Sequence, residues 1–98
     1  MSMYNRYSFA KDIYRDYLVI IRRKNKYYSF DKDKLILDYI GFSDKLYLIR
    51  KYSISYIILD NLDIIDMVIY DSNNYYKYLY LSYIKRILYE MKGCIINE

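Results

Sequence analysis

The chain has 98 residues, 55% of them hydrophobic, and a formal net charge of +4, which favours one folded domain with a modest core over a disordered segment. It has no His, a single Cys (Cys94) and glycine only at positions 41 and 93. This composition excludes a histidine general base, a Ser-His-Asp or Cys-His nucleophile, an ordinary zinc site and a glycine-rich phosphate loop. We therefore expect one domain over 1–98 that is not an enzyme and needs no cofactor.

Neither end of the chain predicts export or membrane insertion. No window reaches about 18 uncharged apolar residues, and Asn5, Arg6 and Lys11 interrupt the N-terminal segment where a signal peptide would be apolar. A lone cysteine fits a reducing compartment. The expected location is the cytoplasm.

The positive charge is concentrated in the first half of the chain. Residues 1–51 hold 12 Lys and Arg against 6 Asp, whereas residues 52–98 hold 4 against 6 acidic residues. The halves therefore carry +6 and −2, and such an asymmetry favours a polyanionic partner, of which nucleic acid is the commonest. The 17 tyrosines are open to two interpretations, the A/T-rich codons of a low-GC genome or rings that face a ligand.

The first elements are a helix over 5–16 and a hairpin over 17–30. Apolar residues at helical spacing predict the helix, and β-branched and aromatic residues predict both strands. If Lys24 and Asn25 form a two-residue turn, Arg23 faces Lys26 across the strands. Facing like charges are unfavourable, so the pattern favours an element that meets phosphates, the alternative being a charged edge that prevents aggregation.

Two short helices follow, joined by a glycine turn. Asp31 or Asp33 is expected to cap a helix that runs to Ile40, and Ser43 is expected to cap a second one over 44–52. The turn contains Gly41, which predicts a helix-turn-helix whose second helix exposes Lys45, Arg50 and Lys51.

The remaining elements are a second hairpin and a long helix. Segments 54–60 and 64–70 predict strands around an acidic turn, so this hairpin is expected to face the core or a partner and not DNA. A helix over 75–92 ends at Gly93, and its wide apolar and tyrosine surface favours a homodimer, with core packing as the alternative.

The order of these elements resembles a winged helix-turn-helix domain. We therefore expect an α+β fold of that kind, with an added basic β-hairpin and a long C-terminal helix. Together with the Tyr, Ile and Lys bias, the pattern is similar to the TcpK-like origin-of-transfer-binding proteins of clostridial conjugative plasmids. That resemblance implies a dimer that marks a plasmid sequence for conjugation, with other proteins of the transfer machinery as partners.

A second resemblance links residues 16–35 to the N-terminal mismatch-reading domain of MutS. Aligning Phe30 and Asp33 with that family's pattern places Lys26 where the wedge Phe belongs and Tyr28 where the Glu belongs. Both residues that read the mismatch are therefore replaced, and the resemblance implies at most a shared fold fragment.

The leading hypothesis is sequence-specific binding of double-stranded DNA at an AT-rich repeated site, with no membrane partner. Two alternatives remain open. One is a small phage- or plasmid-encoded inhibitor of a host protein, anchored by tyrosines. The other is a metal-dependent nuclease, for which Asp31 and Asp33 beside Lys32 and Lys34, or Glu90 and Lys92, supply the residue types without a convincing pattern. The candidate DNA-contacting residues are Arg22, Arg23, Lys24, Asn25, Lys26, Tyr27, Lys45, Arg50 and Lys51.

Overall fold

Within the described residues, four strands form one mixed sheet in the order β2-β1-β3-β4. The computed structural model describes residues 2–96. β1 pairs antiparallel with β2 and parallel with β3, and β3 pairs antiparallel with β4. The strands are β1 (Leu18–Arg23), β2 (Lys26–Tyr28), β3 (Tyr56–Asp60) and β4 (Asp63–Val68). The parallel neighbours β1 and β3 are thus joined by a crossover that contains β2 and two helices.

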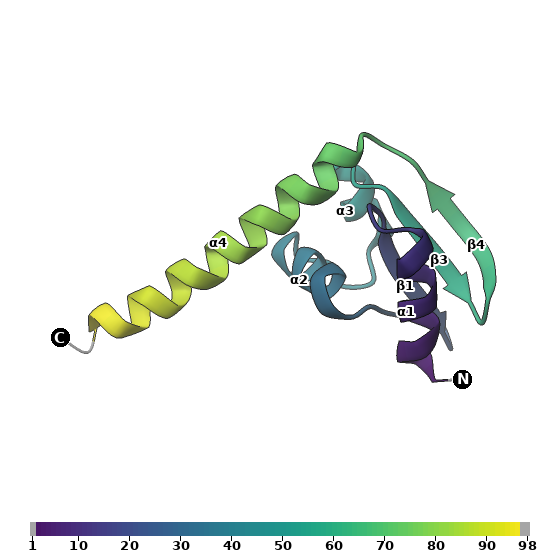
Figure 1. Ribbon diagram of the computed structural model, residues 1–98, viewed down its shortest axis with the longest axis horizontal. Helices are drawn as coiled ribbons and strands as arrows, with labels where there is room; N and C mark the ends of the chain where they lie inside the picture. The colour runs from purple at the N-terminus through teal and green to yellow at the C-terminus, as the bar shows by residue number, and fades with distance from the viewer. Residues whose placement is uncertain (1, 97–98) are drawn as a thin grey trace.

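The described part of the chain has four helices, which lie on the two faces of this sheet (Figure 1). α1 covers one face, α2, α3 and the first part of α4 cover the other, and the rest of α4 projects away from the body. The helices are α1 (Met3–Ile13), α2 (Asp31–Tyr39), α3 (Leu46–Lys51) and α4 (Ser72–Ile96). Among the residues described, no helix is both long and apolar enough to cross a bilayer.

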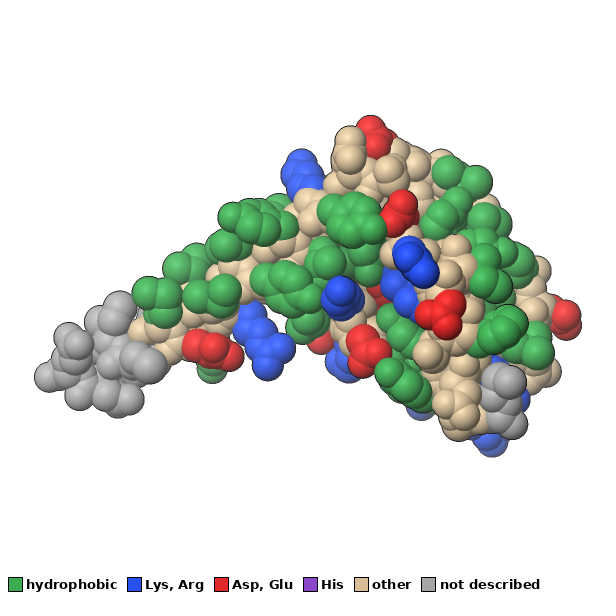
Figure 2. Space-filling model, viewed as in Figure 1, with side chains coloured by type: hydrophobic (Ala, Val, Ile, Leu, Met, Phe, Trp, Pro, Cys, Tyr) green, Lys and Arg blue, Asp and Glu red, His purple; other side chains and the backbone are tan. Residues whose placement is uncertain are grey.

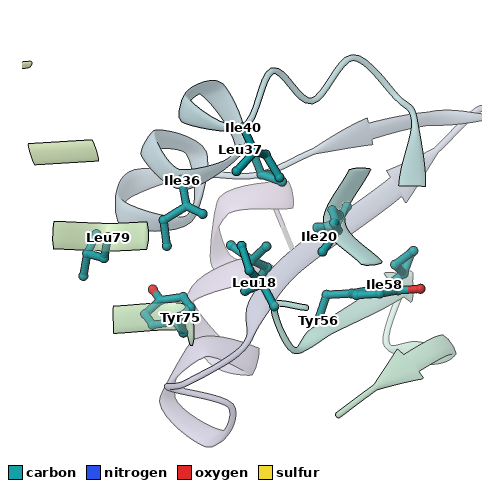
Figure 3. Packing of buried hydrophobic residues seen from close by; sticks show 11 residues of the cluster. Leu18, Ile20, Ile36, Leu37, Ile40, Tyr56, Ile58, Tyr75 and Leu79 are labelled. Atoms are coloured by element: carbon teal, nitrogen blue, oxygen red, sulfur yellow. The ribbon is translucent and has the colours of Figure 1, made fainter. Parts of the chain in front are cut away.

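The larger core lies between the sheet and α2, α3 and α4. Two side chains from each central strand point toward these helices, as Figure 3 shows: Leu18 and Ile20 of β1, and Tyr56 and Ile58 of β3. They meet apolar side chains of the three helices and of the segments beside them, namely Ile36, Leu37, Ile40, Ile49, Ile54, Tyr75 and Leu79. Alternation along each strand places every second side chain on this face.

The smaller core lies under α1. It contains the side chains that alternate with those of the larger core, namely Val19 and Ile21 of β1 and Ile57 and Leu59 of β3. From α1, Tyr7 and Ala10 are buried against them. Because β1 and β3 are covered on both faces, their sequences are nearly continuous apolar runs. β4 is different: it is an edge strand, and most of its side chains are exposed.

The structure confirms the α+β class, the basic hairpin and the long C-terminal helix, and it corrects several helix ends. α1 ends at Ile13 and not at residue 16, because β1 follows after a short turn. α4 begins at Ser72 and continues through Gly93, which therefore does not end it. Gly41 does adopt the left-handed conformation, with φ +76°, in the turn after α2.

The two predicted helix caps are wrong. The N-cap of α2 is Phe30 and that of α3 is Lys45, and neither side chain caps the helix. Asp33 lies inside α2, where its carboxylate accepts hydrogen bonds from other elements, and Asp44 precedes α3 with a φ of 56°. Local capping propensity was outweighed here by tertiary contacts.

Candidate nucleic-acid interface

The β1–β2 hairpin has the predicted two-residue turn and register. Lys24 and Asn25 both have positive φ, 51° and 63°, which is the geometry of a type I′ turn. Arg22 pairs with Tyr27 across the strands, and Arg23 pairs with Lys26. Asn tolerates this backbone conformation better than Lys, so the turn places a lysine where its backbone is strained.

The hairpin tip consists of Arg23, Lys24, Asn25 and Lys26, and all four side chains are exposed. No acidic side chain among the described residues forms an ion pair with the three cations of the tip. At the other end of the hairpin, away from the turn, Ser29 Oγ donates a 2.7 Å hydrogen bond to the carbonyl of Val19 and so ties the two strands together. The hairpin therefore presents three uncompensated positive charges on a supported strand pair.

Two of the predicted contact residues make side-chain contacts within the fold. Arg22 Nη2 lies 3.1 Å from Asp60 Oδ2, because the parallel register places the end of β3 beside the end of β1. Tyr27 is partly buried, and its ring meets Phe42 edge-on with the centroids 6.2 Å apart. Arg22 and Tyr27 therefore connect the hairpin to β3 and to the turn after α2.

The other predicted contact residues lie on or beside α3. Lys45 and Lys51 are exposed, and neither forms an ion pair with another residue in the described part of the chain. Arg50 is also exposed but donates a 3.2 Å hydrogen bond to the Tyr56 hydroxyl, which in turn donates to Asp66 Oδ2 at 3.0 Å. Burial and this hydrogen bond to Asp66 raise the pKa of Tyr56. Arg50 is thus tied to β3 and β4.

The hairpin tip and α3 are separate surfaces. Arg50 contacts Tyr56, which lies level with Leu18 in the sheet, whereas Arg23 lies five residues farther along β1. At about 3.3 Å per residue, that separation is about 16 Å along the strand. The sequence thus grouped positive residues that the fold divides between two regions.

The second hairpin has an acidic turn, and of its two strands β3 is buried in the core whereas β4 is mostly exposed. Its turn carries Asp60 and Asp63, and β4 exposes apolar side chains such as Ile64 and Met67. Ile64 borders a groove of about 160 Å³ between β4 and α1, which Phe9 and Ile13 also line. The basic tip of the first hairpin therefore adjoins a surface of very different chemistry.

A buried polar cluster was missed by the sequence reasoning. The Asp33 carboxylate is fully buried and accepts four hydrogen bonds: from Tyr7 Oη at 3.0 Å, Tyr75 Oη at 2.6 Å, Lys11 Nζ at 2.9 Å and the Val19 backbone N–H at 3.0 Å. The donors come from α1, β1 and α4, so this Asp33 cluster joins three elements to α2. A signal existed, because Asp33 precedes Ile36, Leu37 and Ile40 at helical spacing and so belongs to the buried face of its helix.

The Asp33 cluster borders a cleft but offers it no free base. The cleft measures about 440 Å³ and is lined by Lys11 and Tyr75 together with Arg15, Lys32 and Tyr76. Lys11 Nζ donates to Asp33, Tyr75 Oη and the carbonyl of Tyr17, which uses all three of its N–H bonds. Burial lowers the pKa of Lys11, and burial beside Asp33 raises those of Tyr7 and Tyr75.

Comparison with known proteins adds no family assignment. No protein-family model matches the chain, and no curated protein or solved structure matches it either. The case for a function therefore rests on the chain's own residues.

Proposed function

We propose that this protein binds double-stranded DNA through the tip of its β1–β2 hairpin. The observation that carries the proposal is the tip itself: Arg23 and Lys26 face each other, Lys24 lies beside them in the turn, and all three are exposed without an ion pair in the described chain. Such an arrangement costs folding free energy unless an anion is near. A row of phosphates compensates these charges and releases counterions on binding.

Each side chain of the tip has a distinct role in this proposal. Arg23, Lys24 and Lys26 contact phosphates, and Asn25, whose amide can both donate and accept, reads a base edge. A narrow tip with these residues suits the minor groove of AT-rich DNA, where the potential is most negative. Arg22 supports the tip through Asp60 and does not contact DNA.

The helix-turn-helix is a secondary part of the proposal. In this proposal, α2, the Gly41 turn and α3 correspond to the helix pair of a winged helix, and β3–β4 corresponds to its wing. α3 has only six residues, and Arg50 is held by Tyr56, so Lys45 and Lys51 are its free contacts to the backbone. The role in plasmid transfer, which the resemblance implied, stays a prediction.

A second candidate, an inhibitor of a host protein, is favoured by a different observation. The groove between α1 and β4 is lined by four apolar side chains that are 49–62% exposed, namely Phe9, Ile13, Leu62 and Ile64. Neighbouring apolar side chains of this kind mark protein interaction sites. This candidate moves ahead if the chain does not bind DNA.

An electrophoretic mobility experiment with a pool of random duplexes tests the proposal. The duplexes are offered with non-specific competitor, and the bound fraction is sequenced. The proposal predicts a shifted band enriched in AT-rich sequences, and replacing Asn25 by Ala flattens that enrichment. Absence of a shift at low salt contradicts the proposal.

A further inference from the structure

We infer that α4 pairs with α4 of a second copy of this chain, in antiparallel orientation. This inference concerns the part of α4 that leaves the body, seen at the left of Figure 1. It does not rest on DNA binding, so either proposal can fail while the other holds.

The helix is apolar on the face turned away from its own core. Tyr75, Leu79 and Ser82 are buried against the body. Ile84 follows Tyr75 by about two and a half turns and so points in the opposite direction. On that opposite side lies the α4 stripe, which we define as Tyr80, Ile84, Ile87 and Met91 with Leu81 and Leu88 beside them.

Four of the six side chains of the α4 stripe are more than half exposed, and Leu81 and Ile84 are partly buried. Tyr80 is 64% exposed, Ile87 51%, Leu88 59% and Met91 52%. Figure 2 shows apolar side chains along the length of the projecting helix. A surface helix normally turns charged residues outward, so an apolar outer face indicates a surface that is covered in the functional molecule.

The spacing of the α4 stripe is that of a helix–helix seam. Its central residues follow one another at steps of four, three and four positions: Tyr80, Ile84, Ile87 and Met91. This is the a/d pattern of a coiled coil. A two-fold axis that passes between residues 85 and 86 and relates two copies of the chain places the stripe of one copy against the stripe of the other. Ile84 then packs against Ile87 of the second copy, and Tyr80 packs against Met91, a pairing that favours the sulfur–aromatic contact.

Charge selects the antiparallel orientation. Lys77 continues the line of the stripe toward the body, one turn before Tyr80. In a parallel pair, Lys77 would face its own copy across the seam, which is unfavourable. The antiparallel pair separates the two lysines. Lys85 does not lie in the seam, because its Nζ lies 5.6 Å from the ring centroid of Tyr39 on the same protomer.

The available area approaches that of a stable interface. Four exposed apolar side chains with on the order of 100 Å² each, and two partly buried ones with about half of that, give about 500 Å² per protomer, against about 800 Å² for a standard interface. A groove of about 510 Å³ continues the stripe onto the body, where Tyr39, Tyr52 and Tyr78 line it. Those rings extend the apolar surface that a second copy covers.

Sedimentation equilibrium of the full chain at tens of micromolar tests the pairing. The wild type is expected to be a dimer and Ile87→Asp a monomer with an unchanged circular dichroism spectrum, because Ile87 lies outside the core. The matched control is Tyr89→Asp, which changes a 79% exposed aromatic residue off the stripe and should remain a dimer. A monomeric wild type overturns the inference and assigns the stripe to another partner. A dimeric Ile87→Asp overturns it too.

Cysteine cross-linking tests the orientation. In a Cys94→Ser background, a tagged Ile84→Cys chain mixed with an Ile87→Cys chain should form the mixed disulfide at least several-fold faster than either variant cross-links to itself. A parallel seam reverses this order, since it places residue 84 against residue 84. Faster self-cross-linking therefore contradicts the antiparallel arrangement.

Discussion

At the scale of single residues, one carboxylate has the largest structural role. Asp33 is fully buried and receives donors from three other elements, and its charge is offset by Lys11 at 2.9 Å. A buried charge of this kind adds little stability in itself, but removing one partner leaves the other uncompensated. The residue that the sequence offered as a helix cap or a nuclease ligand is therefore needed for the fold.

Replacing Asp33 by Asn should lower the free energy of unfolding by about 3–5 kcal/mol, because it leaves Lys11 buried without its counter-ion. Chemical denaturation followed by circular dichroism measures this. The matched control is Asp31→Asn, two residues away and exposed, whose effect should stay within about 0.5 kcal/mol. Equal effects of the two variants would show that burial at Asp33 is not important.

The second prediction concerns Tyr75 and alkaline pH. Burial, and then the charge of Asp33, raise the pKa of Tyr75 above its usual value, so the folded state holds this hydroxyl protonated. The stability it contributes is complete below the unfolded pKa of about 10 and is lost as the pH rises above it. The lowered pKa of Lys11 acts in the opposite direction, and comparing two chains that both retain Lys11 removes most of its effect.

Tyr75→Phe should therefore be less stable than the wild type by about 1.5–3 kcal/mol near pH 8, the usual value of a hydrogen bond to a charged group. The difference should shrink steadily above about pH 10. Urea unfolding of both chains across this pH range measures it. A constant difference up to pH 11 would contradict the assignment of the Tyr75–Asp33 hydrogen bond.

At the scale of elements, the local sequence predicted the turns, whereas contacts between residues far apart in the chain determined where the helices end. The Lys24-Asn25 turn and the pairing of Arg23 with Lys26 followed from turn chemistry alone, because a two-residue loop fixes the register. The engagement of Arg22 and Arg50 could not be predicted, since their partners Asp60 and Tyr56 come close only after β1 and β3 pair.

A glycine substitution separates the structure of the turn from its charge. Lys24→Gly should raise the free energy of unfolding by about 1 kcal/mol, because glycine adopts a φ of 51° without the strain of a side chain. The same change should weaken duplex binding, since it removes a cation from the tip. Asn25→Gly keeps all three charges and should leave the salt dependence of binding unchanged. Tighter binding by Lys24→Gly would contradict the proposed contact.

At the scale of the whole molecule, the sequence predicted the elements but not their arrangement. Segments 18–23 and 56–60 both read as apolar strands, yet nothing local indicates that they are parallel neighbours at the centre of one sheet. The long crossover between them passes through β2, α2 and α3. Parallel pairing is decided by contacts far apart in the chain, and these leave no periodic signal in either segment.

The same arrangement divides the molecule's surfaces by chemistry. The basic hairpin tip stands at one end of the sheet, and the apolar α4 stripe lies on the helix that projects from the body (Figure 1). If both proposals hold, a dimer joined by α4 carries two tips and favours a repeated or palindromic DNA site. The two surfaces can be altered independently, so each can be tested in a chain that retains the other.

The salt dependence of duplex binding tests the central claim most directly. The binding constant of a short AT-rich duplex is measured by fluorescence anisotropy at salt concentrations from about 50 to about 200 mM. Removing Arg23 and Lys26 together by alanine substitution should reduce the magnitude of the slope of log K against log salt by about 2, since each residue meets about one phosphate. The melting temperature should stay level or rise slightly, because the two like charges face each other. The matched control, Lys85→Ala with Arg86→Ala on α4, removes the same net charge and should leave the slope unchanged. A double variant at Arg23 and Lys26 that keeps the wild-type slope would contradict the account.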